Sequence, residues 1–449
     1  MARRKSAIVV GAGLGGLLSA AVLCRHGCRV TVVERLSFPG GRFTSFNYLG
    51  FEVPTGALHL LPGGRRGQLY TALHALDAAP EVVTPGTGLV IRHNDRRHVL
   101  SRWPLRRGNF LRRLSLRDQV AWMRLACALL LPDRLPDISL ERYVAGIGAS
   151  PLVSTIVDKL TRFAHSVSIA EASVVEVARS FAAQRWSKEA IIVGGCKAVV
   201  DRLVEKIVAC GAALHLEDGA ARVEMRPANG FLVSTECGRS LAADLVVSNA
   251  GPQETVRLLG ASGPRWLREK AARLAPAWGA TYSIRSRTPL LDHAGIEVPL
   301  DAPEIAGYVQ VTNADPGLAA PGWHYLLAYQ RLAPDDVPSQ VERALADLRA
   351  LFPSLEPSDI FNISVYRDRW PTALVSQVVG QYGSMRYPVV IEDIPGFFMV
   401  GDFSQGYGFG AEIIGGADRV LDRALGGVVF GGDGRRDAKP LKAVGIASL

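Results

Sequence analysis

The sequence AIVVGAGLGGLLSAAVLCRHGCRVTVVER runs from Ala7 to Arg35 and joins four local signals in a fixed order. An apolar strand leads into a glycine-rich turn, a helix follows, and a second strand rich in β-branched valines ends at Glu34. The glycines have the spacing G-x-G-x-x-G. Together these signals predict a βαβ unit that binds a dinucleotide.

Each element of this unit has a mechanical role. Gly11 allows the tight turn, Gly13 lets the backbone approach a pyrophosphate, and Gly16 lets the helix pack closely on the strand. The helix presents its first amides to the phosphates, and Glu34 accepts hydrogen bonds from the adenosine ribose. The residues expected to contact the nucleotide here are Gly11, Gly13, Leu14, Gly15, Gly16, Glu34 and Arg35.

A secretory signal peptide is the alternative interpretation of the same stretch, because a basic start precedes an apolar run. Glycine is a poor helix former, however, and four glycines interrupt the run. Beyond Cys24 the chain resumes with another apolar strand instead of becoming polar and irregular. We therefore favour the nucleotide-binding unit and expect a cytoplasmic protein.

Composition is that of a globular protein. A chain of 449 residues is long enough for two or three domains, and no stretch reaches the roughly 18 uninterrupted apolar residues of a membrane span. The six cysteines are scattered and lack metal-ligand spacing, which predicts thiols of a reducing compartment and no metal site.

The formal charge of +9 is concentrated in part in the Arg102–Arg134 segment, where arginines alternate with aromatic and aliphatic residues. Such a segment can lie on an anionic membrane surface, which predicts possible peripheral membrane contact. A helix with a solvated arginine face is an equally good interpretation. Binding of nucleic acid is not expected, because no recognition motif accompanies the charge.

Gly40, Gly41 and Arg42 follow the βαβ unit and suit a loop that runs beside a cofactor, with a guanidinium for a phosphate or a flavin oxygen. The run from Gly11 to Arg42 resembles the N-terminal signature of the FAD-dependent amine oxidase and phytoene desaturase superfamily. The resemblance implies FAD as the cofactor, with contacts from Gly41 and Arg42.

A second glycine-rich motif lies near the end of the chain. A strand from Phe397 to Val400 leads into Gly401 and Asp402, a glycine-rich loop and a helix beginning near Gly410. Asp402 can accept hydrogen bonds from the ribityl hydroxyls, and the helix start can face the flavin or pyrophosphate. This motif is similar to the closing FAD motif of the same superfamily. The resemblance further implies contacts from Gly401, Asp402, Gly410, Ala57, His59 and Ala220.

The expected fold class is α/β. We predict a discontinuous, Rossmann-like FAD-binding domain with a parallel sheet and helices, formed by residues 1–85, 190–258 and 383–430. An α+β substrate domain with a mixed sheet and a helical cap is expected from residues 86–189, read as mainly helical, and 259–382. Residues 431–449 are expected to form a flexible tail.

The superfamily resemblance implies an oxidoreductase that dehydrogenates or saturates carbon–carbon bonds of an apolar isoprenoid, with carotenoid precursors as the leading class. FAD should be non-covalent, because no cysteine lies between Phe403 and Gly410. No second G-x-G-x-x-G is present, so oxygen or a quinone is the expected electron acceptor.

Two alternatives share these motifs. A flavin-dependent amine or protoporphyrinogen oxidase differs only in its substrate pocket. A non-catalytic prenyl-lipid carrier resembling GDP-dissociation inhibitors shares the fold without flavin, but has no need for the full set of nucleotide contacts. His59 is a weak catalytic candidate, for which a hydrogen-bonded structural role is the better interpretation, and His165 is weaker still.

Overall fold

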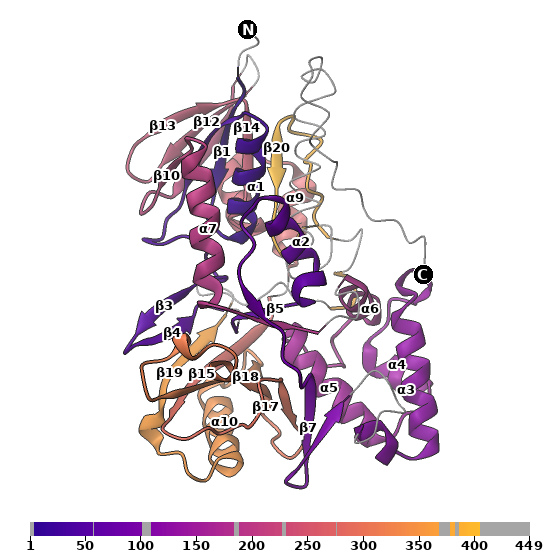
Figure 1. Ribbon diagram of the computed structural model, residues 1–449. Coiled ribbons are helices and arrows are strands. Elements are labelled where there is room, and N and C mark those ends of the chain that lie inside the picture. The colour runs from indigo at the N-terminus through magenta and orange to yellow at the C-terminus, as the bar shows by residue number, and fades with distance from the viewer. Residues whose placement is uncertain are drawn as a thin grey trace.

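The protein has two stacked bodies (Figure 1), a parallel sheet with its helices and a mixed sheet with its own helices. The computed structural model describes residues 4–56, 58–100, 109–183, 188–226, 230–274, 276–367, 378–381 and 386–404. The expected helix near Gly410 and the tail 431–449 lie outside these residues.

The first body contains a five-stranded sheet in the order β10-β2-β1-β14-β20. Every pairing in this sheet is parallel. Both of its faces are covered, which explains why its strands are continuous apolar runs without alternation. The strands are β1 (Ser6–Val10), β2 (Arg29–Val33), β10 (Ala213–His215), β14 (Leu245–Ser248) and β20 (Phe397–Met399).

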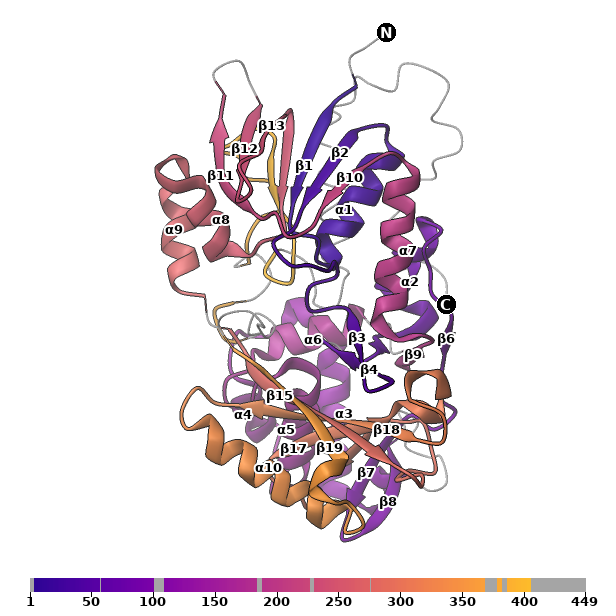
Figure 2. The same cartoon turned by 90° about the vertical axis from the view of Figure 1, so that its left-hand side faces the viewer.

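Alternate side chains of β1 enter two different cores. Val9 packs against α1 (Leu14–Arg25), α2 (Gln68–Ala75) and α7 (Gly195–Ala209). Ile8 packs on the opposite side, toward a three-stranded antiparallel sheet and two helices (Figure 2). These elements are β11 (Ala220–Met225), β12 (Phe231–Thr235), β13 (Ser240–Ala243), α8 (Pro252–Leu259) and α9 (Arg265–Ala272).

The second body is built on a seven-stranded mixed sheet in the order β19-β15-β18-β17-β16-β7-β8. Only the β16–β7 pairing is parallel among these described strands. The strands are β7 (Leu89–His93), β8 (Arg96–Leu100), β15 (Trp278–Ser286), β16 (Glu297–Pro299), β17 (Ile305–Gln310), β18 (His324–Leu332) and β19 (Ile360–Tyr366).

The two faces of the mixed sheet differ in their cover. Helix α10 (Val337–Leu351) packs on one face. The hairpin of β3 (Ser45–Tyr48) and β4 (Phe51–Pro54) packs on the other, where the Phe51 ring lies 5.4 Å from that of Tyr325. The cap helices are α3 (Leu116–Leu129), α4 (Leu140–Gly146), α5 (Pro151–His165) and α6 (Val174–Ala183). A small sheet of β5 (Leu60–Leu61), β6 (Val82–Val83) and β9 (Ala190–Ile192) lies between the bodies.

The prediction that residues 86–189 are mainly helical is wrong at its start. Strands β7 and β8 form a hairpin that completes the mixed sheet. Asn94 and Asp95 at its turn have φ angles of 51° and 55°, the left-handed conformation of a two-residue hairpin turn. The Asn94-Asp95 pair, which suits a two-residue hairpin turn, was the available sequence signal.

The predicted α/β class, with a parallel nucleotide-type sheet and a mixed second sheet, is confirmed. All five parallel strands come from the three segments expected to form the cofactor domain, whereas the exact domain boundaries stay a prediction. Within the described part of the chain, no helix is both long and apolar enough to cross a membrane.

Candidate functional site

The glycine-rich turn after β1 is packed too tightly for side chains. Gly11 has a φ of +96°, a conformation that favours glycine. A Cβ on Gly16 would lie 2.0 Å from the Gly11 carbonyl oxygen, so α1 packs directly on the turn. A Cβ on Gly13 would lie 2.5 Å from Asn249 Oδ1. The conformation of Gly11 and the packing of Gly16 are those of a tight turn and a closely packed helix, whereas Gly13 is closed to a side chain by Asn249, and its approach to a pyrophosphate stays a prediction.

Helix α1 begins without a side-chain cap, because Gly13 occupies the N-cap position. Leu14 and Gly15 follow in its first turn, where backbone amides point out of the helix end. An uncapped helix N-terminus of this kind is suited to a phosphate group. The turn and helix start can therefore hold a pyrophosphate.

Glu34 directly follows β2 and lies beside this turn. Its Oε2 accepts a hydrogen bond from the Ala12 amide at 2.7 Å, and its Oε1 accepts one from the Leu36 amide at 2.9 Å. The side chain is 7 % exposed. Because a carboxylate offers about four acceptor positions, Glu34 can also accept from sugar hydroxyls. The neighbouring Arg35 instead lies 3.5 Å from Glu254 Oε1.

The two glycine-containing motifs, one around Gly41 and the other around Gly401, meet at this site. Gly40 donates a hydrogen bond to the Ala12 carbonyl at 2.7 Å, which brings the loop containing Gly41 against the glycine turn. Arg42 Nη2 then lies 2.8 Å from Asp402 Oδ1. Asp402 follows Gly401 at the end of β20, two places from β1 in the sheet. Two motifs that are far apart in sequence thus share one edge of the parallel sheet.

Asn249 and Arg386 join the same site, although the sequence analysis assigned them no role. Asn249 Nδ2 donates to the Val400 carbonyl at 2.7 Å, and its Oδ1 lies under Gly13. Arg386 Nη1 donates to the Asp402 carbonyl at 2.6 Å, and Arg386 Nε lies 3.3 Å from Glu176 Oε2 in helix α6. Asn249 directly follows the apolar run Leu245–Val247, which was a usable sequence signal, whereas no local pattern marks Arg386.

Ala220 is the first residue of β11, and its carbonyl accepts a hydrogen bond from Arg257 at 3.2 Å. It packs in the same core cluster as Val33, immediately before Glu34. Ala57 and Gly410 lie outside the described residues.

His59 is fully buried, and both of its ring nitrogens have protein partners. Nε2 donates to the Glu52 carbonyl at 2.7 Å, and Nδ1 accepts from the Cys196 amide at 3.2 Å. Burial lowers the pKa of His59, so the ring is neutral at pH 7. This geometry is that of a histidine with a structural role.

His165, at the end of α5, is 4 % exposed. Burial, assisted by the nearby Arg386 cation, lowers the pKa of His165 to about 4. In the unfolded chain His165 has its ordinary pKa of about 6.5. Between pH 6.5 and about 4, His165 is therefore protonated in the unfolded chain but neutral in the folded protein. The free energy of unfolding must therefore decrease as the pH falls through this window.

We expect the free energy of unfolding to be lower at pH 5 than at pH 7 by about 2 kcal/mol from His165 alone. Chemical denaturation at both pH values measures the difference. The variant His165→Gln should show a smaller pH dependence, because it removes the titrating group. An equal dependence in both proteins would contradict the assignment to His165.

The described residues contain no cluster of His, Cys, Asp or Glu that could hold a metal ion. All six cysteines are free.

The chain matches the model of the flavin-containing amine oxidoreductases over residues 14–417. It belongs to this family. The protein is therefore an FAD-dependent oxidoreductase, and the edge of the sheet where β1, β2 and β20 end is the candidate FAD site. The alternative of a flavin-free prenyl-lipid carrier is set aside by this membership.

Two of the proteins similar to this chain match it over nearly its full length. An uncharacterized protein of Methanocaldococcus jannaschii is 29 % identical over 92 % of this chain and 97 % of its own length. The crystal structure of an oxidoreductase from Methanosarcina mazei is 27 % identical, covers 93 % of this chain and 100 % of its own, and has a TM-score of 0.83. A phytoene desaturase of Phycomyces blakesleeanus is 46 % identical, but over only 14 % of this chain and 11 % of its own length.

Proposed function

We propose that this FAD-dependent oxidoreductase changes a carbon–carbon bond of an apolar isoprenoid, in the direction of desaturation or saturation. Oxygen or a quinone would reoxidise the flavin in the first case. The local likeness to a phytoene desaturase supports this substrate class. The exposed face of helix α3 is the structural observation that carries it.

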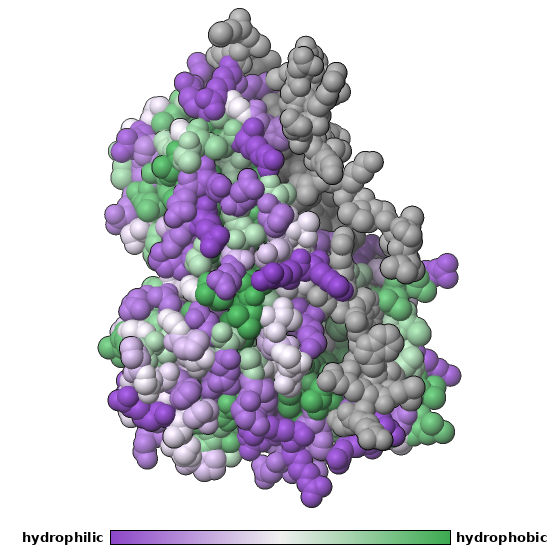
Figure 3. Space-filling model, viewed as in Figure 1, coloured by the Kyte–Doolittle hydropathy of each residue, from purple (hydrophilic) through white to green (hydrophobic). Residues whose placement is uncertain are grey.

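Helix α3 has apolar residues on two faces. Ala121, Leu125 and Leu129 are buried in the core of the second body. The opposite, solvent-exposed face carries a row at helical spacing, with exposed fractions of 78 % at Leu116, 46 % at Val120 and 46 % at Met123. Figure 3 shows apolar surface along the edge of the molecule where Figure 1 places α3.

Arginines border this row and complement a negatively charged lipid surface. Arg117 and Arg124 lie on α3, and Arg112 and Arg134 lie beside its two ends. An apolar face with a basic border suits the boundary between lipid headgroups and acyl chains. A protein held there can take an apolar substrate directly from the bilayer. Other residues of the predicted segment, including Phe110, Leu111 and Leu114, belong to the core instead.

We expect the protein to sediment with vesicles that contain phosphatidylglycerol at low salt and to be released at high salt, because salt screens the arginine charges. The double variant Leu116→Ser/Met123→Ser should bind at least about tenfold more weakly, given about 1.5–3 kcal/mol for each large apolar side chain. Val208→Ser is the control, because Val208 is 53 % exposed on α7. Equal binding by all three proteins would contradict this contact surface.

For the cofactor, we propose that the glycine turn and the start of α1 hold the pyrophosphate, Glu34 the ribose, and Asp402 with Arg42 the ribityl and flavin end. Gly41, Gly401, Arg35 and Ala220 would contribute backbone near these groups. FAD would be bound non-covalently and would accept or supply the transferred electrons. The chain's own residues bind it, orient it and exclude water.

Glu34→Ala and Asp402→Ala should each weaken FAD binding by about 10- to 100-fold, the usual loss when a hydrogen bond to a charged group is removed. The ratio of FAD to protein after gel filtration measures the effect. Glu224→Ala is the control, because Glu224 lies on β11 with a 42 % exposed side chain. Full FAD content in both site variants would remove the assignment.

Oxidation of an amine or another polar substrate is the second candidate, and one face of the mixed sheet favours it. Thr281 and Tyr366 are 1 % and 3 % exposed. The Tyr366 hydroxyl lies near those of Thr281 and Ser364, but neither Thr281 nor Tyr366 has a hydrogen bond of good geometry to another described residue. Both lie on the sheet face that carries Tyr325 and Tyr329, the face toward the β3–β4 hairpin. Buried hydroxyls without partners are costly unless a ligand or water binds them.

Anaerobic reduction of the flavin distinguishes the two candidates. Bleaching of the flavin absorbance by a polyene, with no response to amines or porphyrinogens, supports the isoprenoid. Bleaching by an amine or porphyrinogen, slowed in Tyr366→Phe, supports the second candidate. For the saturating direction, the chemically reduced flavin should instead be reoxidised by the polyene.

A further inference from the structure

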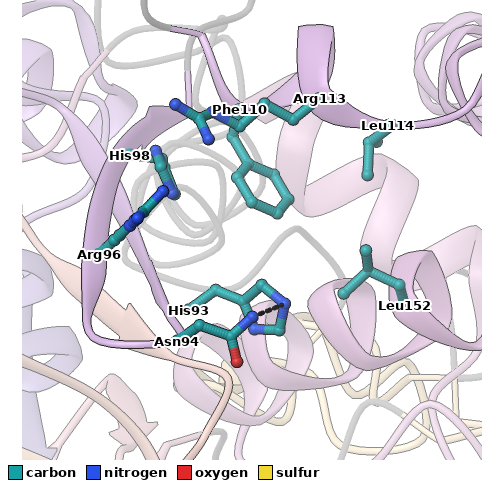
Figure 4. A pocket seen from close by; sticks show the side chains of 8 residues that line it. All are labelled: His93, Asn94, Arg96, His98, Phe110, Arg113, Leu114 and Leu152. Carbon is teal, nitrogen blue, oxygen red and sulfur yellow. Dashed lines mark hydrogen bonds between the residues drawn. The ribbon is translucent and has the colours of Figure 1, made fainter.

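A cavity of about 440 Å³ lies in the second body, in the part of the chain that carries β7, β8 and the start of α5. Figure 4 shows that side chains from the β7–β8 hairpin face those of the 3₁₀ helix η2 (Phe110–Arg113) across it. The Phe110 ring lies between the two histidines of the hairpin, 5.5 Å from the His98 ring and 6.5 Å from the His93 ring. None of the elements that form the FAD site lines this cavity.

The cavity is lined by cationic and hydrogen-bond-donating groups. Arg96 and Arg113 are exposed at its rim, and no carboxylate of the described residues pairs with either guanidinium. Burial lowers the pKa of His98, and the nearby Arg113 and Arg96 cations lower it further. Asn94 adds a side-chain amide.

Two carboxylates lie near the cavity, and neither pairs with Arg96 or Arg113; Asp301 contacts the lining residues His93 and Asn94, the latter through the Asn94 backbone amide at 2.6 Å. Asp301 Oδ1 lies 3.3 Å from His93 Nδ1, on one edge of that ring. Asp95 Oδ1 lies 3.1 Å from Arg92 Nη2. None of the residues lining the cavity is acidic, so its positive charge is not neutralised from within.

We propose that this cavity binds a phosphate group, either of a soluble phosphate ester or of a lipid headgroup. Two guanidiniums, one from β8 and one from η2, lie beside His98 and match the several acceptor oxygens of a phosphate, and imidazole and amide groups can donate further hydrogen bonds. Phe110 provides an apolar floor, which keeps water from one side. The inference does not depend on the substrate proposed above.

The position of the cavity connects it to the exposed face of α3. Arg113 lies three residues before Leu116, the most exposed apolar residue of that face. A lipid whose phosphate occupied the cavity would therefore have its chains close to the α3 surface. A soluble phosphate ester would need only the cavity itself.

The test compares two double variants of the full-length holoenzyme that lose the same charge. Arg96→Gln/Arg113→Gln removes both guanidiniums of the cavity. Arg65→Gln/Arg66→Gln removes two exposed arginines of the 3₁₀ helix Gly64–Arg66, which belong neither to the cavity nor to the basic border of α3. Calorimetry measures binding of inorganic phosphate and glycerol 3-phosphate. Sedimentation measures binding to phosphatidylcholine vesicles with and without phosphatidic acid.

A loss of about tenfold or more in the cavity variant alone would support the site, since each charged hydrogen bond contributes about 1.5–3 kcal/mol. If the loss concerns soluble phosphates, the ligand is a free phosphate ester; if it concerns phosphatidic acid vesicles, the ligand is a headgroup. Equal behaviour of the two double variants, or no binding of any of these ligands by the unmodified protein, would overturn it. If vesicle binding is lost in Leu116→Ser/Met123→Ser but not in the cavity variant, the membrane contact of α3 is supported and the phosphate site is rejected.

Discussion

Replacing Arg386 by methionine should lower the free energy of unfolding by about 3–5 kcal/mol, one of the largest effects expected of a single substitution in this protein. Arg386 and Glu176 form an ion pair whose side chains are 3 % and 1 % exposed. The variant would leave Glu176 charged and buried. Arg179 Nη1, at 4.0 Å from Glu176, would compensate only in part.

The same substitution should weaken FAD binding. Arg386 donates a hydrogen bond to the backbone carbonyl of Asp402, and Arg42 forms an ion pair with the Asp402 carboxylate. Without the hydrogen bond from Arg386, the backbone after β20 is less firmly positioned, and this is where we propose that Asp402 contacts the ribityl group. Guanidinium unfolding monitored by circular dichroism measures stability, and flavin fluorescence on dilution measures FAD release.

Two controls separate the buried pair from a general effect of losing an arginine. Arg265→Met breaks an ion pair with Glu269 whose side chains are 86 % and 53 % exposed. It should cost no more than about 1 kcal/mol, as exposed pairs do. The double variant Glu176→Leu/Arg386→Met should recover much of the lost stability, because no charge then remains buried. If the double variant is less stable than Arg386→Met, the buried charge is not the cause.

Replacing Gly16 by alanine is expected to have the second large effect on stability and FAD binding. In Gly16→Ala the new methyl group would lie 2.0 Å from the Gly11 carbonyl oxygen and 3.1 Å from its carbonyl carbon, both backbone atoms. Neither atom can rotate away, so α1 must shift off β1. We expect a loss of about 1–3 kcal/mol or more in stability, the range for overpacked cores, and loss of FAD from the purified protein.

Gly146→Ala is the matched control for this substitution. A Cβ on Gly146 would meet nothing within 4 Å, and the residue lies in helix α4. Alanine is favoured over glycine in a helix by about 0.5–1 kcal/mol, so this variant should be as stable as the unmodified protein or slightly more so. Thermal unfolding and the absorbance of bound flavin check both variants. A Gly16→Ala protein that is yellow and melts normally would refute the packing argument.

Much of the first body could be predicted from local sequence. The strand, G-x-G-x-x-G turn, helix and second strand between Ala7 and Arg35 have their expected positions, because hydrophobic period and glycine placement are local properties. The closing strand was expected at Phe397–Val400 and is β20 at Phe397–Met399. The hairpin of β7 and β8 was missed, because its two short strands precede a long helical region and its turn residues were given no weight.

The candidate site divides in the same way. Sequence alone could place Gly11, Gly13, Gly16, Glu34 and Asp402 at the end of a strand or in a tight turn, whereas their contacts with FAD stay a prediction. Only the tertiary structure decided that Asn249 lies under Gly13, that Arg42 pairs with Asp402, and that Arg386 connects Asp402 to Glu176 of the cap. The physical reason is that these contacts follow from the order of strands in the sheet and the packing of the cap on its edge. Neither the strand order nor the packing of the cap can be predicted from a local sequence pattern.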